Sequence, residues 1–282
     1  DPEKLPVQEL QLHGAKEIVQ LGNIFNSMLR SIDESMRKVS QAFSAREKAE
    51  NELNIAHEIQ TEIIPQLFPY LPENKHFESF VINLPATNGS NSLYDIQLIA
   101  PNRLCIVAGD ISRSGLPASL YTIVIRTLIL SAGLHADNAG ILLTEINLLF
   151  SRNRRFNTYI SVFLGILDLE TGELSYANAG HCFPVIVRNL RDIEELPTIH
   201  GEPLGMQYGM NYLCDRVKMR IGDVLFVYSN GLINLLKDNM ESQSDITLIR
   251  NLLSLNLRNT ASATMFNVEK HLIDIVEDEE IK

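Results

Sequence analysis

A seven-residue repeat of apolar and small side chains runs from Ile18 to Ile63, and no proline or glycine interrupts it after Gly22. Its two series of positions are spaced like the a and d positions of a coiled coil, whose apolar seam needs a partner helix. The stretch is longer than most helices of globular domains, which run about 8–20 residues. The repeat therefore predicts a parallel coiled coil that makes the chain a homodimer; the alternative is a long surface helix packed on its own domain. The two series are Ile18, Phe25, Ile32, Val39, Arg46, Leu53 and Gln60, and Leu21, Met28, Ser35, Ala42, Ala49, Ala56 and Ile63.

Pro65 ends the repeat, because proline lacks the N–H that a helix needs and its ring clashes with the preceding turn. Four prolines between residues 64 and 85 then mark a linker or the entrance to a domain. We therefore expect two parts, a signalling helix over residues 1–65 and a compact domain over residues 66–282.

The compact part carries strand-like and helix-like runs in blocks rather than in strict alternation. Strand signals cover residues 96–99, 104–108, 159–168, 173–178, 184–187, 212–219 and 224–228, and Gly109-Asp110 is expected to form a turn. Helical periodicity covers residues 116–132, 138–152, 232–238, 246–255 and 261–278. Such blocks, without a dinucleotide-binding or P-loop glycine motif, predict an α+β fold that is a layered sandwich rather than a parallel Rossmann sheet.

Charge and hydropathy narrow the classes of function. The chain has 24 Lys and Arg against 35 Asp and Glu, a net charge of -11, which disfavours nucleic acid as a partner. The longest apolar stretch, residues 121–134, is interrupted by Arg126 and is shorter than the ~20 residues that cross a bilayer. The three cysteines predict neither a disulfide framework nor a zinc site, and the first residues lack both a signal peptide and an initiator Met. We expect a cytoplasmic piece of a longer protein.

Four short stretches carry most of the functional information: residues 85–95, 107–115, 176–181 and 221–231. With residues 56–65 and Pro203-Leu204-Gly205, their order and spacing resemble the SpoIIE-like (RsbU-type) branch of the PPM metal-dependent serine/threonine phosphatases, over roughly residues 55–282. Upstream, residues 17–28, with Glu17-Ile18 and Phe25-Asn26, resemble the second helix of a HAMP signalling module.

The resemblance implies a fold, a reaction and a partner. The fold is an α/β/β/α sandwich of two antiparallel sheets flanked by helices. The reaction is hydrolysis of a phosphoserine or phosphothreonine by a water held between two Mn²⁺ or Mg²⁺ ions. The partner is a STAS-domain anti-sigma-factor antagonist, and a HAMP segment implies attachment of the cytosolic domain to a membrane sensor.

The family's motifs survive in part. Asp110 matches a metal ligand, the backbone carbonyl of Ile111 matches a further one, and Gly115 and Gly231 match motif glycines. Arg113 departs from the small-residue turn that precedes Gly115. It is either a solvated surface charge or a guanidinium that takes the place of missing metal or meets a phosphate on a partner.

Carboxylates are missing at other ligand positions. Ser92 and Asn230 stand where the family has Asp, so a neutral hydroxyl and a neutral amide replace two charges. Asp95 keeps the second Asp of its motif, but three positions along a strand it points to the opposite face from Ser92. For the last carboxylate pair the nearest candidates are Glu280 and residues 244–247, and the sequence does not choose between them.

Loss of at least two of four anionic ligands leaves two dications poorly compensated. The sequence therefore predicts a degenerate phosphatase domain that binds and signals without a metal cofactor. Two alternatives stay open. One is an active enzyme that uses Mn²⁺ or Mg²⁺ at a site rebuilt from Asp110, Asp95 or Glu280, and the other is a pocket for a small ligand between the sheets.

Plainer roles are available for two of these candidates. Asp110 precedes Ser112 in a way that fits a turn cap accepting backbone N–H groups. His181 has the chemistry of a general acid, but the sequence shows no Asp or Cys partner for it, so a structural histidine is the favoured interpretation.

Overall fold

The computed structural model describes residues 34, 37–38, 41, 48, 51–52, 54–55, 77–84, 91–113, 116–133, 135–152, 158–196, 200–239, 243–258 and 260–280. The chain divides into two units, Asp1–Ile55 and Ala56–Lys282. The described positions of the first unit are helical and exposed. The rest of the predicted coiled coil and the prolines of the linker lie outside the described residues, so dimerisation stays a prediction.

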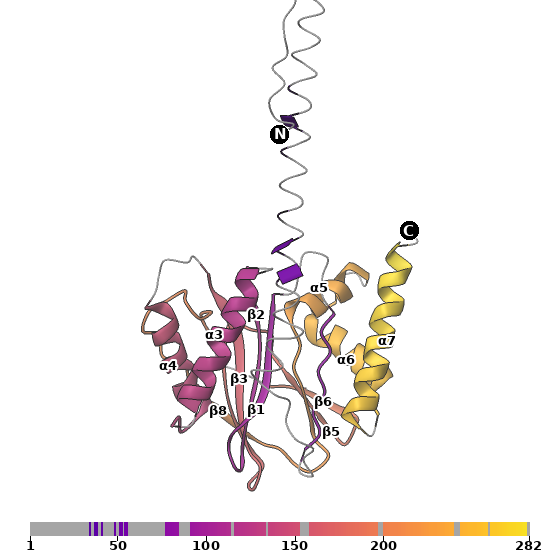
Figure 1. Ribbon diagram of the computed structural model, residues 1–282. Helices are drawn as coiled ribbons and strands as arrows, with labels where there is room; N and C mark the ends of the chain where they lie inside the picture. The colour runs from indigo at the N-terminus through magenta and orange to yellow at the C-terminus, as the bar shows by residue number, and fades with distance from the viewer. Residues whose placement is uncertain are drawn as a thin grey trace, which may run out of the picture. The chain divides into compact units, whose positions relative to one another are not determined.

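The second unit is a sandwich of two sheets between two layers of helices (Figure 1). Sheet A has the strand order β1-β2-β3-β4-β7, with β8 also paired to β4, and sheet B has the order β6-β5-β9. The α/β/β/α fold is thus confirmed, except that β7 runs parallel to β4. The strands are β1 (Ser92–Ala100), β2 (Arg103–Ile111), β3 (Ile160–Asp168), β4 (Glu173–Ala179), β5 (Val185–Arg188), β6 (Asp192–Glu195), β7 (His200–Gly201), β8 (Asp215–Lys218) and β9 (Val224–Phe226). The helices are α3 (Leu116–Gly133), α4 (Ala139–Ser151), α5 (Asn230–Asn239), α6 (Asp245–Asn256) and α7 (Ala261–Glu280).

Three clusters of buried side chains hold these layers together. The first joins α3 and α4 to sheet A, with Ile125 and Leu142 fully buried. The second joins α5, α6 and α7 to sheet B, through residues such as Val185 and Leu252. The third lies between the sheets around Phe163. Because side chains alternate along a strand, β3 and β4 contribute to the first and third clusters at once.

The predicted helices are confirmed to within three residues at each end, and most predicted strands are present. The expected turn at Gly109-Asp110 is wrong, because β2 continues through both residues to Ile111. Gly109 serves close packing instead: a Cβ there would lie 2.3 Å from the backbone oxygen of Ser161 on β3. The short strands β6 and β7 were not expected, since four and two residues give little periodicity to detect.

Among the described helices, α3 is long and apolar enough to cross a membrane by length and composition. Its buried Ile125 and Ile129 instead pack on sheet A, in the first cluster. Arg126, in the middle of this helix, donates from Nη2 to Asp95 Oδ1 on β1 at 2.6 Å, and both side chains are nearly buried. Burial raises the pKa of Asp95, although the Arg126 guanidinium opposes this shift.

The first prediction concerns this buried ion pair. Replacing Arg126 with Met leaves the Asp95 carboxylate buried and uncompensated, which costs about 3–5 kcal/mol of unfolding free energy. The pKa of Asp95 then rises further above its unfolded value, so protonation favours the folded state and the loss shrinks as the pH falls from 7 towards 5. Urea unfolding at both pH values measures the effect.

Arg216→Met is the matched control, because its ion pair with Glu173 is exposed and contributes less than about 1 kcal/mol. Equal losses for the two variants, or a loss for Arg126→Met that does not change with pH, would contradict the role given to the buried pair.

Candidate functional site

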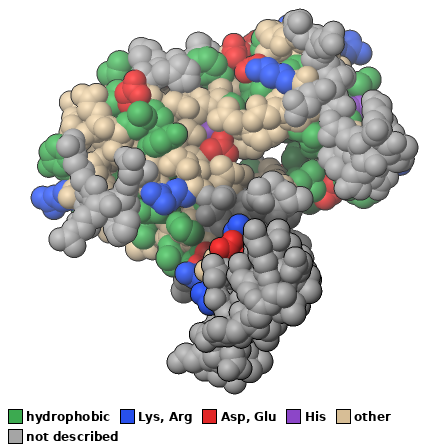
Figure 2. All heavy atoms as spheres, turned by 90° about the horizontal axis from the view of Figure 1, so that it is seen from above, with side chains coloured by type: hydrophobic (Ala, Val, Ile, Leu, Met, Phe, Trp, Pro, Cys, Tyr) green, Lys and Arg blue, Asp and Glu red, His purple; other side chains and the backbone are tan. Residues whose placement is uncertain are grey.

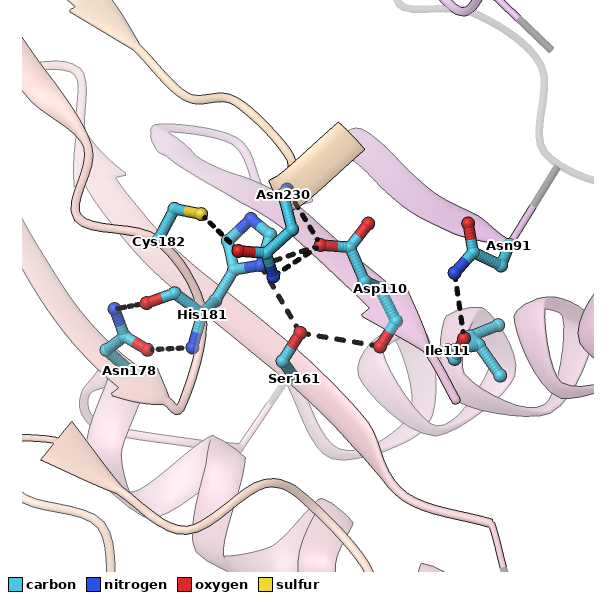
Figure 3. A network of polar contacts seen from close by, with 8 residues as sticks. All are labelled: Asn91, Asp110, Ile111, Ser161, Asn178, His181, Cys182 and Asn230. Carbon is cyan, nitrogen blue, oxygen red and sulfur yellow. Dashed lines mark hydrogen bonds and ion pairs between the residues drawn. The ribbon is translucent and has the colours of Figure 1, made fainter. Parts of the chain in front are cut away.

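The candidate site lies between the sheets, where β2 ends, β3 begins and α5 starts (Figure 3). Asp110 belongs to β2, Ser161 to β3 and Asn230 to the first turn of α5, while His181 and Cys182 follow β4. Residues 110 and 161 are directly paired across β2 and β3. The antiparallel register therefore brings these two side chains together from positions far apart in the sequence.

Asp110 connects sheet A to helix α5. Its Oδ2 accepts hydrogen bonds from the backbone N of Asn230 at 3.1 Å and from Asn230 Nδ2 at 3.2 Å. A carboxylate at this position satisfies a free N–H at the start of α5 and interacts favourably with the positive end of the helix dipole. Asp110 therefore accepts a backbone N–H, as a cap does. The group that it caps is the start of a helix 120 residues away and not the local turn expected from the sequence.

His181 is buried beside Asp110, with 2% of its surface exposed. Its Nδ1 lies 3.6 Å from Asp110 Oδ2 and 3.4 Å from Ser161 Oγ. Burial lowers the pKa of His181, and the negative charge of Asp110 opposes this shift. The absence of an Asp partner for His181 was therefore a wrong expectation, because Asp110 approaches it through the fold rather than through the sequence.

These three side chains do not form a serine nucleophile relay. In such a relay the serine contacts one ring nitrogen of the histidine and the aspartate contacts the other. Here Ser161 and Asp110 both approach Nδ1. The backbone N of His181 donates to Asn178 Oδ1 at 2.7 Å, and Asn178 Nδ2 donates to the His181 carbonyl at 3.0 Å. These bonds fix the turn after β4, which supports a structural role for His181.

Cys182 completes the network on the other side of Asn230. Its Sγ donates to Asn230 Oδ1 at 3.1 Å. Burial and, secondarily, the nearby Asp110 charge raise the pKa of Cys182 to about 12. A thiol with this pKa is protonated at neutral pH and is a poor nucleophile.

The backbone carbonyl of Ile111, expected as a metal ligand, takes part in another hydrogen bond. Asn91 Nδ2 donates to this carbonyl at 3.1 Å, and the backbone N of Ile111 donates to the carbonyl of Asn91 at 2.8 Å. Asn91 was not singled out in the sequence. Its place just before Ser92 in a motif stretch is the signal that could have found it.

A cavity of about 420 Å³ opens beside this network. Asp110 is the one carboxylate among the described residues that line it, and none of these residues is Lys or Arg. The lining residues are Asn91, Asp110, Ile111, Ser112, Tyr159, Ser161, Gly180, Pro203, Asn230, Gly231 and Asn234.

The structure brings some of the predicted ligand positions together and separates others. Ser92 is paired with Asp110 across β1 and β2, and Asn230 is hydrogen-bonded to Asp110. Asp95 is separated from them, because it lies on the opposite face of β1 against Arg126. It therefore does not belong to this site, and the alternative that Asp95 rebuilds the metal site is wrong for that reason.

The remaining candidates lie at the rim or outside the described part of the site. Arg113 Nε donates to Thr158 Oγ1 at 2.9 Å, so its guanidinium is held beside β3 rather than against Asp110. Gly115 lies outside the described residues. Glu280 is the last residue of α7, and its side chain lies outside them too. Residues 244–247 begin α6, where Asp245 forms an ion pair with Lys237 at 2.7 Å.

Comparison with known proteins assigns the family. The sequence profile of the family "Stage II sporulation protein E (SpoIIE)" matches residues 100–279, which is more than half of the chain. The chain belongs to the SpoIIE family. Among curated proteins it is similar to Protein IcfG of Synechocystis sp., with 26% identity over 208 residues. That match covers 64% of this chain and 32% of IcfG, so the chain spans about a third of the length of this relative.

Solved structures of related domains share the fold. The SiaA-PP2C domain of Pseudomonas aeruginosa matches with a TM-score of 0.63 and 17% identity, covering 83% of this chain and 91% of that one. The PP2C phosphatase domain of SpoIIE from Bacillus subtilis, solved with a fragment of its regulatory domain, matches with a TM-score of 0.55 and 14% identity. It covers 66% of this chain and 53% of that one. At these identities the likeness shows the fold alone.

One structure with this fold was solved with a metal ion. The groups around Asp110 that could bind a metal therefore matter for the function of this chain. RsbX, which has the same fold at a TM-score of 0.50 and 13% identity, was solved in complex with magnesium. In the described part of this chain, no group of three or more His, Cys, Asp or Glu side chains could hold a metal ion. The described side chains around Asp110 are amides, hydroxyls, a thiol and the His181 imidazole, whereas two hard dications need several carboxylates.

The second prediction tests the cap formed by Asp110. Asp110→Ala removes the acceptor for the first N–H of α5 and should lower the unfolding free energy by about 1–2 kcal/mol in the absence of metal. Asp110→Asn keeps an acceptor oxygen and should lose less. Urea unfolding in the presence of EDTA measures both. An unchanged midpoint for Asp110→Ala would show that the carboxylate does not stabilise the metal-free fold.

Proposed function

We propose that this SpoIIE-family domain binds a partner in a partner-switching pathway without catalysing metal-dependent dephosphorylation. One observation carries the proposal: the carboxylate of Asp110 binds the amide and backbone of Asn230, at the place where the family positions metal ligands. Ser92 lies beside it across the strands and supplies a hydroxyl instead of a second carboxylate.

The number of carboxylates at the site supports the proposal that the domain does not use two metal ions. Two dications held close together carry four positive charges, and a carboxylate at about 4 Å contributes roughly 4 kcal/mol per unit of metal charge at an effective dielectric near 20. Replacing two carboxylates by neutral groups removes that compensation without removing the repulsion between the metals. One oxygen of the remaining carboxylate, Asp110 Oδ2, accepts hydrogen bonds from Asn230 that a metal bound to that oxygen would have to displace.

The family resemblance supports a protein partner of the STAS type, an anti-sigma-factor antagonist. One solved relative joins RsbU and RsbW domains in a single chain, and it matches this one with a TM-score of 0.50 and 22% identity. We further propose that the coiled-coil repeat pairs two copies and that a HAMP-like segment attaches this cytoplasmic domain to a membrane sensor. Nucleic acid is not the proposed partner: on the face shown in Figure 2, the described Lys and Arg side chains are scattered among acidic and hydrophobic ones.

The second candidate is an active phosphoserine phosphatase that uses Mn²⁺ or Mg²⁺. Family membership and the retained Asp110 favour it. It requires a metal site rebuilt from Asp110 and carboxylates outside the described residues, with Glu280 as the nearest candidate in the sequence.

The third prediction separates the two candidates. Release of phosphate from a phosphoserine protein is measured with and without Mn²⁺ for the native chain, Ser92→Asp, Asn230→Asp and the double variant, together with calorimetric Mn²⁺ titration. We expect no Mn²⁺-dependent release from the native chain. The double variant should bind Mn²⁺ at least about tenfold more tightly, because it adds two carboxylates beside Asp110.

Asn234→Asp is the matched control. It adds a carboxylate to the same cavity, but the structure describes no hydrogen bond or ion pair between Asn234 and Asp110. Mn²⁺-dependent turnover by the native chain would overturn the proposed function.

The fourth prediction concerns the coiled coil. Sedimentation equilibrium of the whole chain should give a dimer, and removal of residues 1–55, which form the first unit, should shift the mass towards a monomer. A monomer in both samples would remove the coiled-coil proposal, and a dimer in both would move the interface to the second unit.

A further inference from the structure

The cavity beside Asp110 has an unbalanced negative charge. Within the described lining, Asp110 carries the one carboxylate and no Lys or Arg faces it. The guanidinium of Arg113, the cation nearest in sequence, is bound to Thr158 through its Nε.

Asp110 uses only one of its two oxygens in this network. Oδ2 accepts both bonds from Asn230, whereas no hydrogen bond to Oδ1 occurs among the described residues. In Figure 3 this second oxygen points away from Asn230 and His181. The side chain keeps 14% of its surface exposed, beside the cavity. A carboxylate with a free oxygen at the edge of a cavity is a ready acceptor for an incoming donor.

Other lining groups add acceptors of the same kind. Asn91 donates its amide nitrogen to Ile111, so its amide oxygen is left to accept. Ser112 Oγ accepts from the backbone N of Tyr159 and has a further lone pair. Tyr159 is 48% exposed and offers an aromatic ring, which attracts cations over its face.

We propose that this cavity binds a single positively charged group, a guanidinium or a primary ammonium, and does not bind phosphate. The inference rests on the proposed function, because a site filled by two metal ions would have the opposite preference. A guanidinium has five donors in one plane and matches a carboxylate oxygen together with amide and hydroxyl oxygens. A cavity of about 420 Å³ is large enough to admit such a group and falls within the usual range for ligand sites.

Two sources could supply this chemistry, an Arg or Lys side chain on a partner protein or a free small amine. The fifth prediction therefore uses two probes, methylguanidinium and a short peptide with one central Arg. Inorganic phosphate and the same peptide with Gln in place of Arg are the matched negative probes. Binding to the full chain is followed by NMR amide shifts or calorimetry at low ionic strength, without added metal.

We expect saturable binding of both cationic probes and none of phosphate or the Gln peptide. Asp110→Asn should weaken cation binding at least about tenfold, and Ser92→Asp should strengthen it by a similar factor, because it adds a charge directly beside Asp110. An Arg peptide that binds at least tenfold more tightly than methylguanidinium would assign the site to a protein partner. Equal affinities would assign it to a small ligand.

Binding of phosphate, absence of cation binding, or cation binding that neither variant changes would overturn the inference. Ser92→Asp keeps the test valid if Asp110→Asn fails to fold. Mn²⁺-dependent turnover by the native chain would instead overturn the proposed function. No turnover combined with no cation binding would overturn this inference alone, so the two failures are distinguishable.

Discussion

The hydrogen bonds between Asp110 and Asn230 link parts of the fold that share no continuous chain. Asp110 lies one residue before the end of β2 in sheet A, and Asn230 begins the helix that packs on sheet B through Ile233 and Leu236. The apolar cluster between the sheets stabilises their packing, but hydrophobic contacts are non-directional and do not determine the exact position of one sheet on the other. A charged acceptor at the start of a helix is directional, so this contact determines where α5 begins relative to β2.

The charge balance of the site follows from that contact. Asp110 accepts the first N–H of α5 and places a negative charge at the positive end of that helix, which weakens its attraction for an anion. His181 and Ser161 pack beside Asp110, and Cys182 donates to Asn230 on the other side of the contact. Among the described residues that line the cavity, Asp110 supplies the one carboxylate, beside amide and hydroxyl groups. This donor set supports the proposed preference of the cavity for one cation over a pair of metals and a phosphate.

The fold could be predicted from the sequence because its long elements have clear periods. Helix α3 is the simplest case, since its apolar spacing and the Arg126 interruption are both visible in the sequence. The site was predictable only in part. Motif order placed Asp110, Ser92 and Asn230 together, but Ser161 reaches Asp110 through strand register and His181 reaches it through the turn after β4. A Gly-Asp pair looks like a turn locally, and only pairing on both sides of β2 makes it a strand.

In the proposed function, the amide at Asn230 in place of a carboxylate and the loss of a metal requirement are a single change. Its backbone and side chain both lie within hydrogen-bond distance of Asp110 Oδ2, at 3.1 and 3.2 Å. A carboxylate at the same place would put two negative groups in contact, an arrangement that is stable only with cations between them or with one group protonated. An amide turns that repulsion into a hydrogen bond. The amide of Asn230 thus lets the start of α5 meet β2 through hydrogen bonds to Asp110.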